Sequence, residues 1–254
     1  MEEIILILLG LIVGSFLNVV IHRLPLEESI IKPRSHCPSC STTIPFYDNI
    51  PVISYILLWG RCRHCRVKIS LVYPLVELLT ALSFWLAYLY FGREPLYAAF
   101  SILFLCLLLV QALIDLKHMI LPLEISIGGA VVFLLYSFFN PFISPLNAFA
   151  SAAGAALAFA ALYFFYLKVR KIEGLGQGDI WMMLLLGSFL GVNKLIIAVL
   201  LASVAGVMVG LFFIVFKKKN LKLALPFGTF LSLGSWVSLF WGNEILRWMQ
   251  SFYQ

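Results

Sequence analysis

The pattern of apolar and polar positions is dominated by long apolar runs separated by short polar loops. A transmembrane helix needs about 20 mostly apolar residues. Eight stretches meet or approach this length, at roughly residues 4–21, 72–91, 96–114, 123–139, 146–167, 180–192, 194–216 and 223–242. The sixth stretch is short, which favours a tilted or half-buried helix. The pattern therefore predicts an all-α polytopic membrane protein with about eight transmembrane helices.

A single polar insert, residues 22–71, interrupts these runs. The first run follows Met-Glu-Glu instead of a basic segment, and no small-residue cleavage site comes after it. It is therefore expected to be a retained helix and not a signal peptide. The chain is expected to divide into a first helix at 1–21, a soluble insert at 22–71 and a membrane core at 72–254.

Composition and charge support this interpretation. The chain is 62% hydrophobic and 12% charged, with a mean hydropathy of +1.01, whereas soluble domains are about 45–50% apolar and about 25% charged. If the N-terminus lies outside and the eight helices alternate, 15 of the 18 Lys and Arg residues fall inside. This positive-inside bias predicts a multi-pass inner-membrane protein with both termini outside. The net charge of +6 then reflects topology and contact with anionic membrane lipid, and implies no nucleic acid partner.

Two aspartates stand at the ends of apolar stretches. The chain has three aspartates, and Asp48 lies in a polar loop, but Asp115 ends the third stretch and Asp179 opens the sixth. An ionisable group at such a place indicates function, and two carboxylates can act as base and acid in aspartyl proteolysis. The predicted topology puts both on the cytoplasmic side. The alternatives are a helix-start carboxylate for Asp179 and a pairing of Asp115 with His118 or Lys117.

Other residues near these stretches extend the candidate site. Gly174, Gly176 and Gly178 precede Asp179 and would allow a tight bend and the approach of a substrate backbone. Glu77 lies one turn into the second stretch and is a third acid expected on the cytoplasmic face. It would order the site or bind a basic group; the alternative is an interfacial carboxylate that reaches out to solvent.

The insert carries two Cys-x-x-Cys motifs, formed by Cys37 with Cys40 and Cys62 with Cys65, with 21 residues between them. Four thiolates at this spacing can surround one Zn²⁺. An insert of this size buries little core, so a metal would supply folding energy. A reducing cytoplasm argues against disulfides. Structural zinc is therefore predicted, with a redox or iron–sulfur role as the alternative, and Cys106 is expected to be a small buried hydrophobe.

The order of the motifs carries a resemblance along nearly the whole chain. The motifs are Gly14 to Asn18, His22 to Pro25, Arg34 to Cys40, Asn49 to Pro51, Gly60 to Cys65, Tyr73-Pro74 with Glu77, Ile114-Asp115, Leu121-Pro122, Gly176 to Asp179 and Pro226 to Gly228. Together they resemble the type IV prepilin peptidases (leader peptidase/N-methyltransferase).

This resemblance implies an inner-membrane aspartyl endopeptidase whose site faces the cytoplasm. Such enzymes cut the basic leader of type IV prepilins and type II pseudopilins after a glycine. Those with four cysteines usually also N-methylate the new terminus with S-adenosylmethionine. Asp115 and Asp179 match the catalytic pair of the family, and the four cysteines match its zinc-binding group.

The sequence departs from the family pattern at two positions, where Trp181 replaces a frequent Lys and Leu123 replaces a frequent Asp. No Gly-x-Gly-x-x-Gly motif of a βαβ unit is present, so any S-adenosylmethionine site would have to come from the insert and nearby loops. A presenilin-like protease is a second enzyme interpretation, but it would place both aspartates deep within its helices, whereas here both stand at the ends of apolar stretches. A proton- or ion-coupled transporter, or a zinc-stapled assembly factor without protease activity, remains the alternative function.

Overall fold

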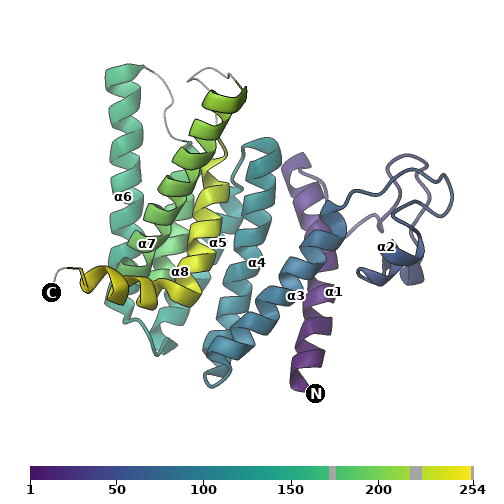
Figure 1. Ribbon diagram of the computed structural model, residues 1–254, viewed down its shortest axis with the longest axis horizontal. Coiled ribbons are helices and arrows are strands. Elements are labelled where there is room, and N and C mark those ends of the chain that lie inside the picture. Colours follow the sequence, from purple (N-terminus) through teal and green to yellow (C-terminus); the bar gives the residue numbers. More distant parts are fainter. Residues whose placement is uncertain (172–175, 218–224, 253–254) are drawn as a thin grey trace. The chain divides into compact units, whose positions relative to one another are not determined.

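The computed structural model describes residues 1–171, 176–217 and 225–252, and within them all regular elements are helices (Figure 1). Gly174 falls outside the described residues. The α-helices are α1 Glu2–Arg23, α2 Ile53–Leu57, α3 Val72–Phe91, α4 Pro95–His118, α5 Leu123–Tyr136, α6 Pro145–Arg170, α7 Gln177–Lys217 and α8 Phe227–Gln250. The 3-10 helices are η1 Leu24–Leu26, η2 Phe46–Asn49 and η3 Ser137–Phe139. The all-α fold class is confirmed.

The chain forms two compact units, Met1–Val110 (unit 1) and Gln111–Gln254 (unit 2). In unit 1, α1 packs closely against α3 because glycines face the contact. A methyl group added at Gly10 would lie 2.6 Å from the Ala81 Cα, and one added at Gly14 would lie 2.6 Å from the Glu77 Cα. Small residues allow membrane helices to approach in this way. The contact fixes Glu77 against the middle of α1. The predicted division at residues 21 and 71 stays a prediction.

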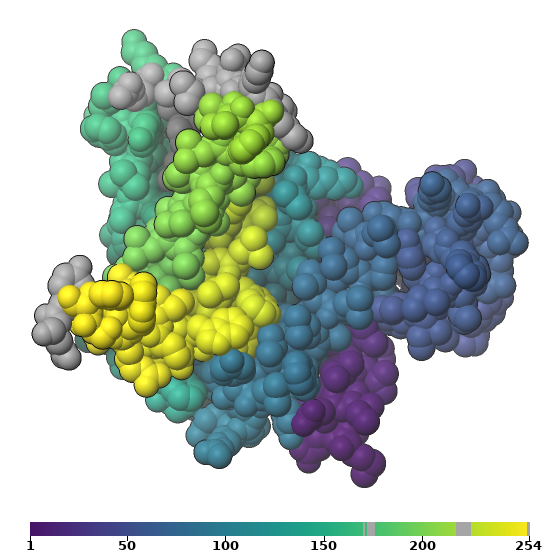
Figure 2. Space-filling model, in the orientation of Figure 1, coloured from purple at the N-terminus to yellow at the C-terminus, as the bar shows by residue number. Residues whose placement is uncertain are grey.

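Residues 27–71 of unit 1 form the cysteine lobe, which stands beside the α1 and α3 pair (Figure 2). Its two Cys-x-x-Cys turns repeat one backbone pattern 25 positions apart. The Cys37 N–H donates to the Thr42 carbonyl at 3.0 Å, and the Cys62 N–H donates to the Val67 carbonyl at 2.9 Å. Each turn also contains a residue with positive φ and an isolated antiparallel bridge. The repeat brings both cysteine pairs together without a large core.

In unit 2, α7 packs against α5, α6 and α8. A methyl group added at Gly187 would lie 2.7 Å from the Ala152 Cα, so α6 and α7 meet at backbone distance. The helix of α7 breaks at Gly191, where φ is 68° and ψ is 174°. The Asn147 side-chain carbonyl accepts from the Val192 N–H at 3.1 Å and supports this break. The break lies two residues before the predicted boundary between the sixth and seventh stretches, at residue 193.

Five helical segments among the described residues are long and apolar enough to cross a membrane: Glu2–Leu26, Val72–Phe91, Pro95–His118, Pro145–Val169 and Gln177–Phe216. Leu123–Phe139 is apolar but shorter. The eighth predicted stretch begins outside the described residues, and α8 does not satisfy the same criteria of length and composition. A multi-pass membrane protein is therefore supported, but the predicted number of eight transmembrane helices is not confirmed.

Candidate active site and metal centre

Asp115 lies near the C-terminal end of α4 and its side chain is only 5% exposed. Its Oδ2 accepts a hydrogen bond from the Thr229 backbone N–H at 2.7 Å and lies 3.1 Å from the Thr229 hydroxyl. The same hydroxyl lies 2.9 Å from the Ala112 carbonyl, to which it can donate. Thr229 belongs to the first turn of α8, whose backbone N–H groups have no partner within the helix. The start of α8 therefore holds Asp115 in position.

Asp179 lies in the first turn of α7 and is also 5% exposed. Its Oδ2 accepts from the Gly176 N–H at 3.1 Å, and its own N–H donates to the Gly176 carbonyl at 3.1 Å. This reciprocal turn fixes the carboxyl at the beginning of α7, as the predicted helix-start arrangement requires. The local role does not compete with a catalytic role, because one carboxylate oxygen remains without a bond to the described chain.

Leu121 connects the two aspartates. A methyl group at Gly178 would lie 2.8 Å from the Leu121 Cβ, and one at Gly228 would lie 2.8 Å from the Leu121 Cδ2 and 3.1 Å from the Asp115 Oδ2. The residue before Asp179 and the residue before Thr229 thus touch the same side chain. Gly178 is required by this close approach, since a side chain there would meet the Leu121 Cβ, whereas at Gly228 the Leu121 methyl groups would have to move.

The two carboxyl groups interact electrostatically, as Asp115 acts as a like charge on Asp179. Within the described part of the chain, neither forms an ion pair with a basic side chain. Two buried acids that are close enough to interact and have no basic partner carry an uncompensated cost of burial. Such a pair is typical of aspartyl hydrolysis.

Glu77 belongs to unit 1, where it is 8% exposed and its Oε2 accepts from the Val52 N–H at 2.7 Å. The carboxyl does not reach outward as an interfacial side chain would. It lines a cavity that unit 1 forms between α1, α3 and the cysteine lobe. Its predicted support of the aspartates stays a prediction.

The four lobe cysteines, Cys37, Cys40, Cys62 and Cys65, bring their sulfur atoms within 4.8 Å of one another. The Cys37 and Cys65 sulfurs lie 3.8 Å apart. A tetrahedral zinc site with Zn–S bonds of about 2.3 Å has ligand sulfurs about 3.8 Å apart, so the four residues fit a zinc ion. All four are free thiols, which is consistent with a metal site and not with disulfides.

Two of the four lobe cysteines, Cys40 and Cys62, are shifted towards the thiolate form, whereas the pKa of Cys65 is raised to about 11, because the backbone hydrogen bond with Val67 is outweighed by burial and by hydrogen bonds with the other cysteines. The hydrogen bond to the Thr42 hydroxyl lowers the pKa of Cys40 to about 6, and the backbone N–H of Cys65 lowers the pKa of Cys62. Metals bind the thiolate form. Cys106 is buried in α4 away from this group, as expected for a small apolar residue.

Two residues that hold the aspartates in place, Leu121 and Thr229, could not be predicted from the chemistry of their side chains. Leu121 and Thr229 carry no charge and belong to no recognised ligand set. Leu121 nevertheless belongs to the Leu121-Pro122 motif, and Thr229 directly follows the motif that ends at Gly228. The sequence motifs at or beside these two positions were therefore the available signal, and the structure shows their role, which is to hold the two aspartates in place.

Comparison with known proteins identifies the family. The profile of the bacterial peptidase A24 N-terminal domain matches residues 8–91, and the profile of the type IV leader peptidase family matches residues 102–211. Proteins named prepilin leader peptidase/N-methyltransferase are similar over most of the chain. The one from Aeromonas hydrophila is 35% identical, covering 95% of this chain and 91% of the relative. That of Pseudomonas aeruginosa is 34% identical, covering 95% and 91%.

The relative from Myxococcus xanthus is 43% identical over 81% of this chain but only 61% of its own length. No solved structure matches the chain. The resemblance predicted from the motifs is confirmed by these relatives. The chain therefore belongs to the type IV leader peptidase family.

Proposed function

We propose that the chain removes the basic leader of prepilins or pseudopilins, and that Asp115 and Asp179 are the catalytic pair. The observation that carries this proposal is the meeting of two buried, unpaired acids around Leu121 in unit 2. The membership of the family and the names of the relatives support the same reaction class.

The chemistry follows from the proximity of the two acids. Like charges at short range do not both ionise easily, so the pair shares one proton. The ionised member then takes a proton from water as the water attacks the scissile carbonyl, and the protonated member donates to the carbonyl oxygen. The tetrahedral intermediate then collapses: the C–N bond breaks, the aspartate that took the proton from water gives it to the leaving nitrogen, and the other aspartate recovers its proton as the carbonyl re-forms. The products are a carboxylic acid on the leader and a new amino terminus on the pilin.

The Thr229 hydroxyl suits both states of Asp115. When Asp115 is ionised, the hydroxyl can donate to its Oδ2 across the 3.1 Å contact. When Asp115 is protonated, the hydroxyl can accept from it and donate to the Ala112 carbonyl instead. The backbone N–H of Thr229 remains a donor in both cases. Thr229 is thus a positioning residue that tolerates movement of the shared proton.

The substrate would be a membrane-inserted prepilin whose basic leader remains in the cytoplasm, in line with the positive-inside bias of the chain. Glycine before the cleaved bond suits this site, because a residue without a side chain unwinds readily from a helix. Cleavage after glycine and entry from the surrounding lipid are parts of the same proposal.

We further propose that the chain methylates the new amino terminus with S-adenosylmethionine and that the cysteine lobe holds a structural zinc ion. The names of the relatives include N-methyltransferase activity. The cysteine cluster has the donor set and the spacing that zinc requires. Zinc here would stabilise the lobe, because four thiolate ligands leave no open coordination position.

The test is cleavage of a prepilin by the detergent-purified chain, followed by gel shift and mass spectrometry. Asp115→Asn and Asp179→Asn should each reduce cleavage by at least about 10³-fold, the scale on which loss of a catalytic group is felt. Glu244→Gln is the matched control, since it removes an exposed carboxyl of the same unit. Wild-type cleavage by either aspartate variant would remove that residue from the pair.

A further inference from the structure

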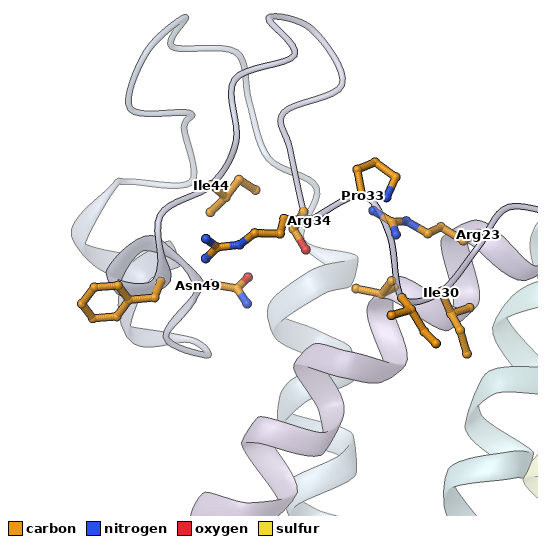
Figure 3. A pocket seen from close by; sticks show the side chains of 10 residues that line it. Arg23, Ile30, Pro33, Arg34, Ile44 and Asn49 are labelled. Atoms are coloured by element: carbon orange, nitrogen blue, oxygen red, sulfur yellow. The ribbon is translucent and has the colours of Figure 1, made fainter.

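Unit 1 contains a cavity of about 720 Å³ whose lining residues all belong to that unit. Its walls come from the C-terminal half of α1, the first turns of α3 and the cysteine lobe. A smaller cavity of about 290 Å³ is also lined by Arg23, Pro33, Ile44 and Asn49, which belong to both (Figure 3). Sites for small ligands have about 300–1,000 Å³, so the space fits a nucleoside-sized molecule.

Besides the paired Asp48 and Arg63, the walls contain two buried residues of opposite charge, Glu77 and Arg23, that are not paired with each other. Glu77 is 8% exposed and its carboxyl has no basic partner among the described residues. Arg23 is 7% exposed and donates to the Ser29 carbonyl at 2.9 Å. It forms no ion pair with an acidic side chain of the described residues. Arg34 also points into the smaller cavity, beside Ile44 and Asn49 (Figure 3).

Glu77 and Arg23 are held at different levels along α1, and the structure shows no salt bridge between them. Glu77 packs at the level of Gly14, and Arg23 follows nine residues later in α1. At 1.5 Å per residue the two levels are roughly 13 Å apart along the helix. Buried charges are costly unless they are compensated. A ligand with a cation at one end and an anion at the other would compensate both.

We propose that this cavity binds the methyl donor S-adenosylmethionine, with Glu77 facing its sulfonium group and Arg23 facing its carboxylate. The inference rests on the proposed methyltransferase function and assigns the residues for it. The donor's ammonium group shares a carbon with its carboxylate, so the sulfonium is the cation that remains for Glu77. Tyr73 and Asn49 also line the cavity and offer an aromatic face and an amide to the adenosine. When bound, the donor supplies the methyl group.

Binding to the purified full-length chain in detergent tests the charge assignment directly. Isothermal titration would compare S-adenosylmethionine, S-adenosylhomocysteine, which lacks the sulfonium charge, and methylthioadenosine, which lacks the amino-acid carboxylate. Glu77→Gln should weaken S-adenosylmethionine about tenfold or more and S-adenosylhomocysteine much less, as expected for loss of one charge contact. Arg23→Gln should weaken both of these and leave methylthioadenosine unchanged.

The controls use an exposed pair of the same unit, Arg93→Gln and Glu94→Gln, which should bind all three ligands as wild type does. Glu77→Asp keeps the charge and should keep the preference for S-adenosylmethionine over S-adenosylhomocysteine. The ratio of the affinities for the two ligands is measured within one variant, so partial loss of folded protein does not alter it.

Three results would overturn the inference. If wild type binds the donor and both Glu77→Gln and Arg23→Gln keep its affinity, the donor site lies elsewhere and the proposed function stands. Equal weakening of all three ligands by Glu77→Gln would reflect a change in packing and not a charge contact. Absence of donor binding by wild type would remove the proposed use of S-adenosylmethionine together with this site.

Discussion

Thr229→Val is the sharpest perturbation of the proposed protease site. Valine has nearly the shape of threonine but lacks the hydroxyl, so the substitution removes the 3.1 Å contact with the Asp115 Oδ2 and the 2.9 Å bond to the Ala112 carbonyl. The backbone N–H that binds Asp115 at 2.7 Å is retained. The variant therefore keeps Asp115 at the site but removes the group that can serve both of its protonation states.

The magnitude follows from the bond that is lost. A hydrogen bond to a charged group contributes about 1.5–3 kcal/mol, and each 1.4 kcal/mol is about tenfold in rate. If the hydroxyl stabilises the transition state, kcat should fall by roughly tenfold to a hundredfold. KM should change little, because Thr229 contacts Asp115 and is assigned no contact with the substrate. Thr229→Ser keeps a hydroxyl and should restore most of the rate.

The assay is cleavage of a purified prepilin under initial-rate conditions, with kcat and KM determined separately. Thr80→Val is the matched control, because its buried hydroxyl donates to the Val76 carbonyl of its own helix, at 2.8 Å, and is assigned no contact with either aspartate. A Thr229→Val enzyme with unchanged kcat would refute the positioning role. A variant whose loss appears only as lower stability, with no rescue by serine, would refute it as well.

Three further changes test other parts of the structure. Gly178→Ala should lower cleavage at least tenfold, since its methyl would lie 2.8 Å from a leucine Cβ and overpacking costs about 1–3 kcal/mol. Cys37→Ser should abolish bound zinc, measured by plasma mass spectrometry, whereas Cys106→Ser should retain it. Arg63→Gln should lower the melting temperature at neutral pH, because the Arg63 guanidinium lowers the pKa of Asp48 through two hydrogen bonds of 2.7 and 2.5 Å. A carboxyl whose pKa is lowered in the folded state stabilises the fold at pH values above its ordinary pKa, near 4. The difference in melting temperature between wild type and variant should therefore stay level above about pH 5 and narrow only below about pH 4. A difference in melting temperature that is constant down to about pH 3 would contradict the assignment.

The helices could be predicted from the sequence because membrane helices are long and continuously apolar. The predicted stretch at 72–91 coincides with α3, and that at 123–139 covers α5 with η3. The break at Gly191 lies within two residues of the gap between the predicted stretches 180–192 and 194–216. The number of membrane crossings could not be settled this way, because α8 mixes apolar and polar positions and its length does not reveal whether it crosses or lies at the interface.

The candidate site was partly predictable for a related reason. Asp115, Asp179 and the cysteines have few roles available to them in an apolar chain, so chemical type alone singled them out. Thr229 and Leu121 have many roles, and only the fold gives them one. Their function depends on α8 and the loop after α4 meeting at the same point, which no periodicity encodes.

If unit 2 cleaves the leader and unit 1 binds the methyl donor, cleavage must precede methylation. The amino group that accepts the methyl exists only after the leader has been cut, so Asp115→Asn should remove both the cleaved and the methylated product. A defect in the donor cavity should act later: Glu77→Gln should give cleaved pilin that lacks the methyl group, a difference of one CH₂ in the mass of its terminal peptide. Any methylated but uncut prepilin would show that methyl transfer does not use the new amino terminus. Loss of cleavage in Glu77→Gln with folding intact would return Glu77 to the aspartate site, as the sequence first predicted.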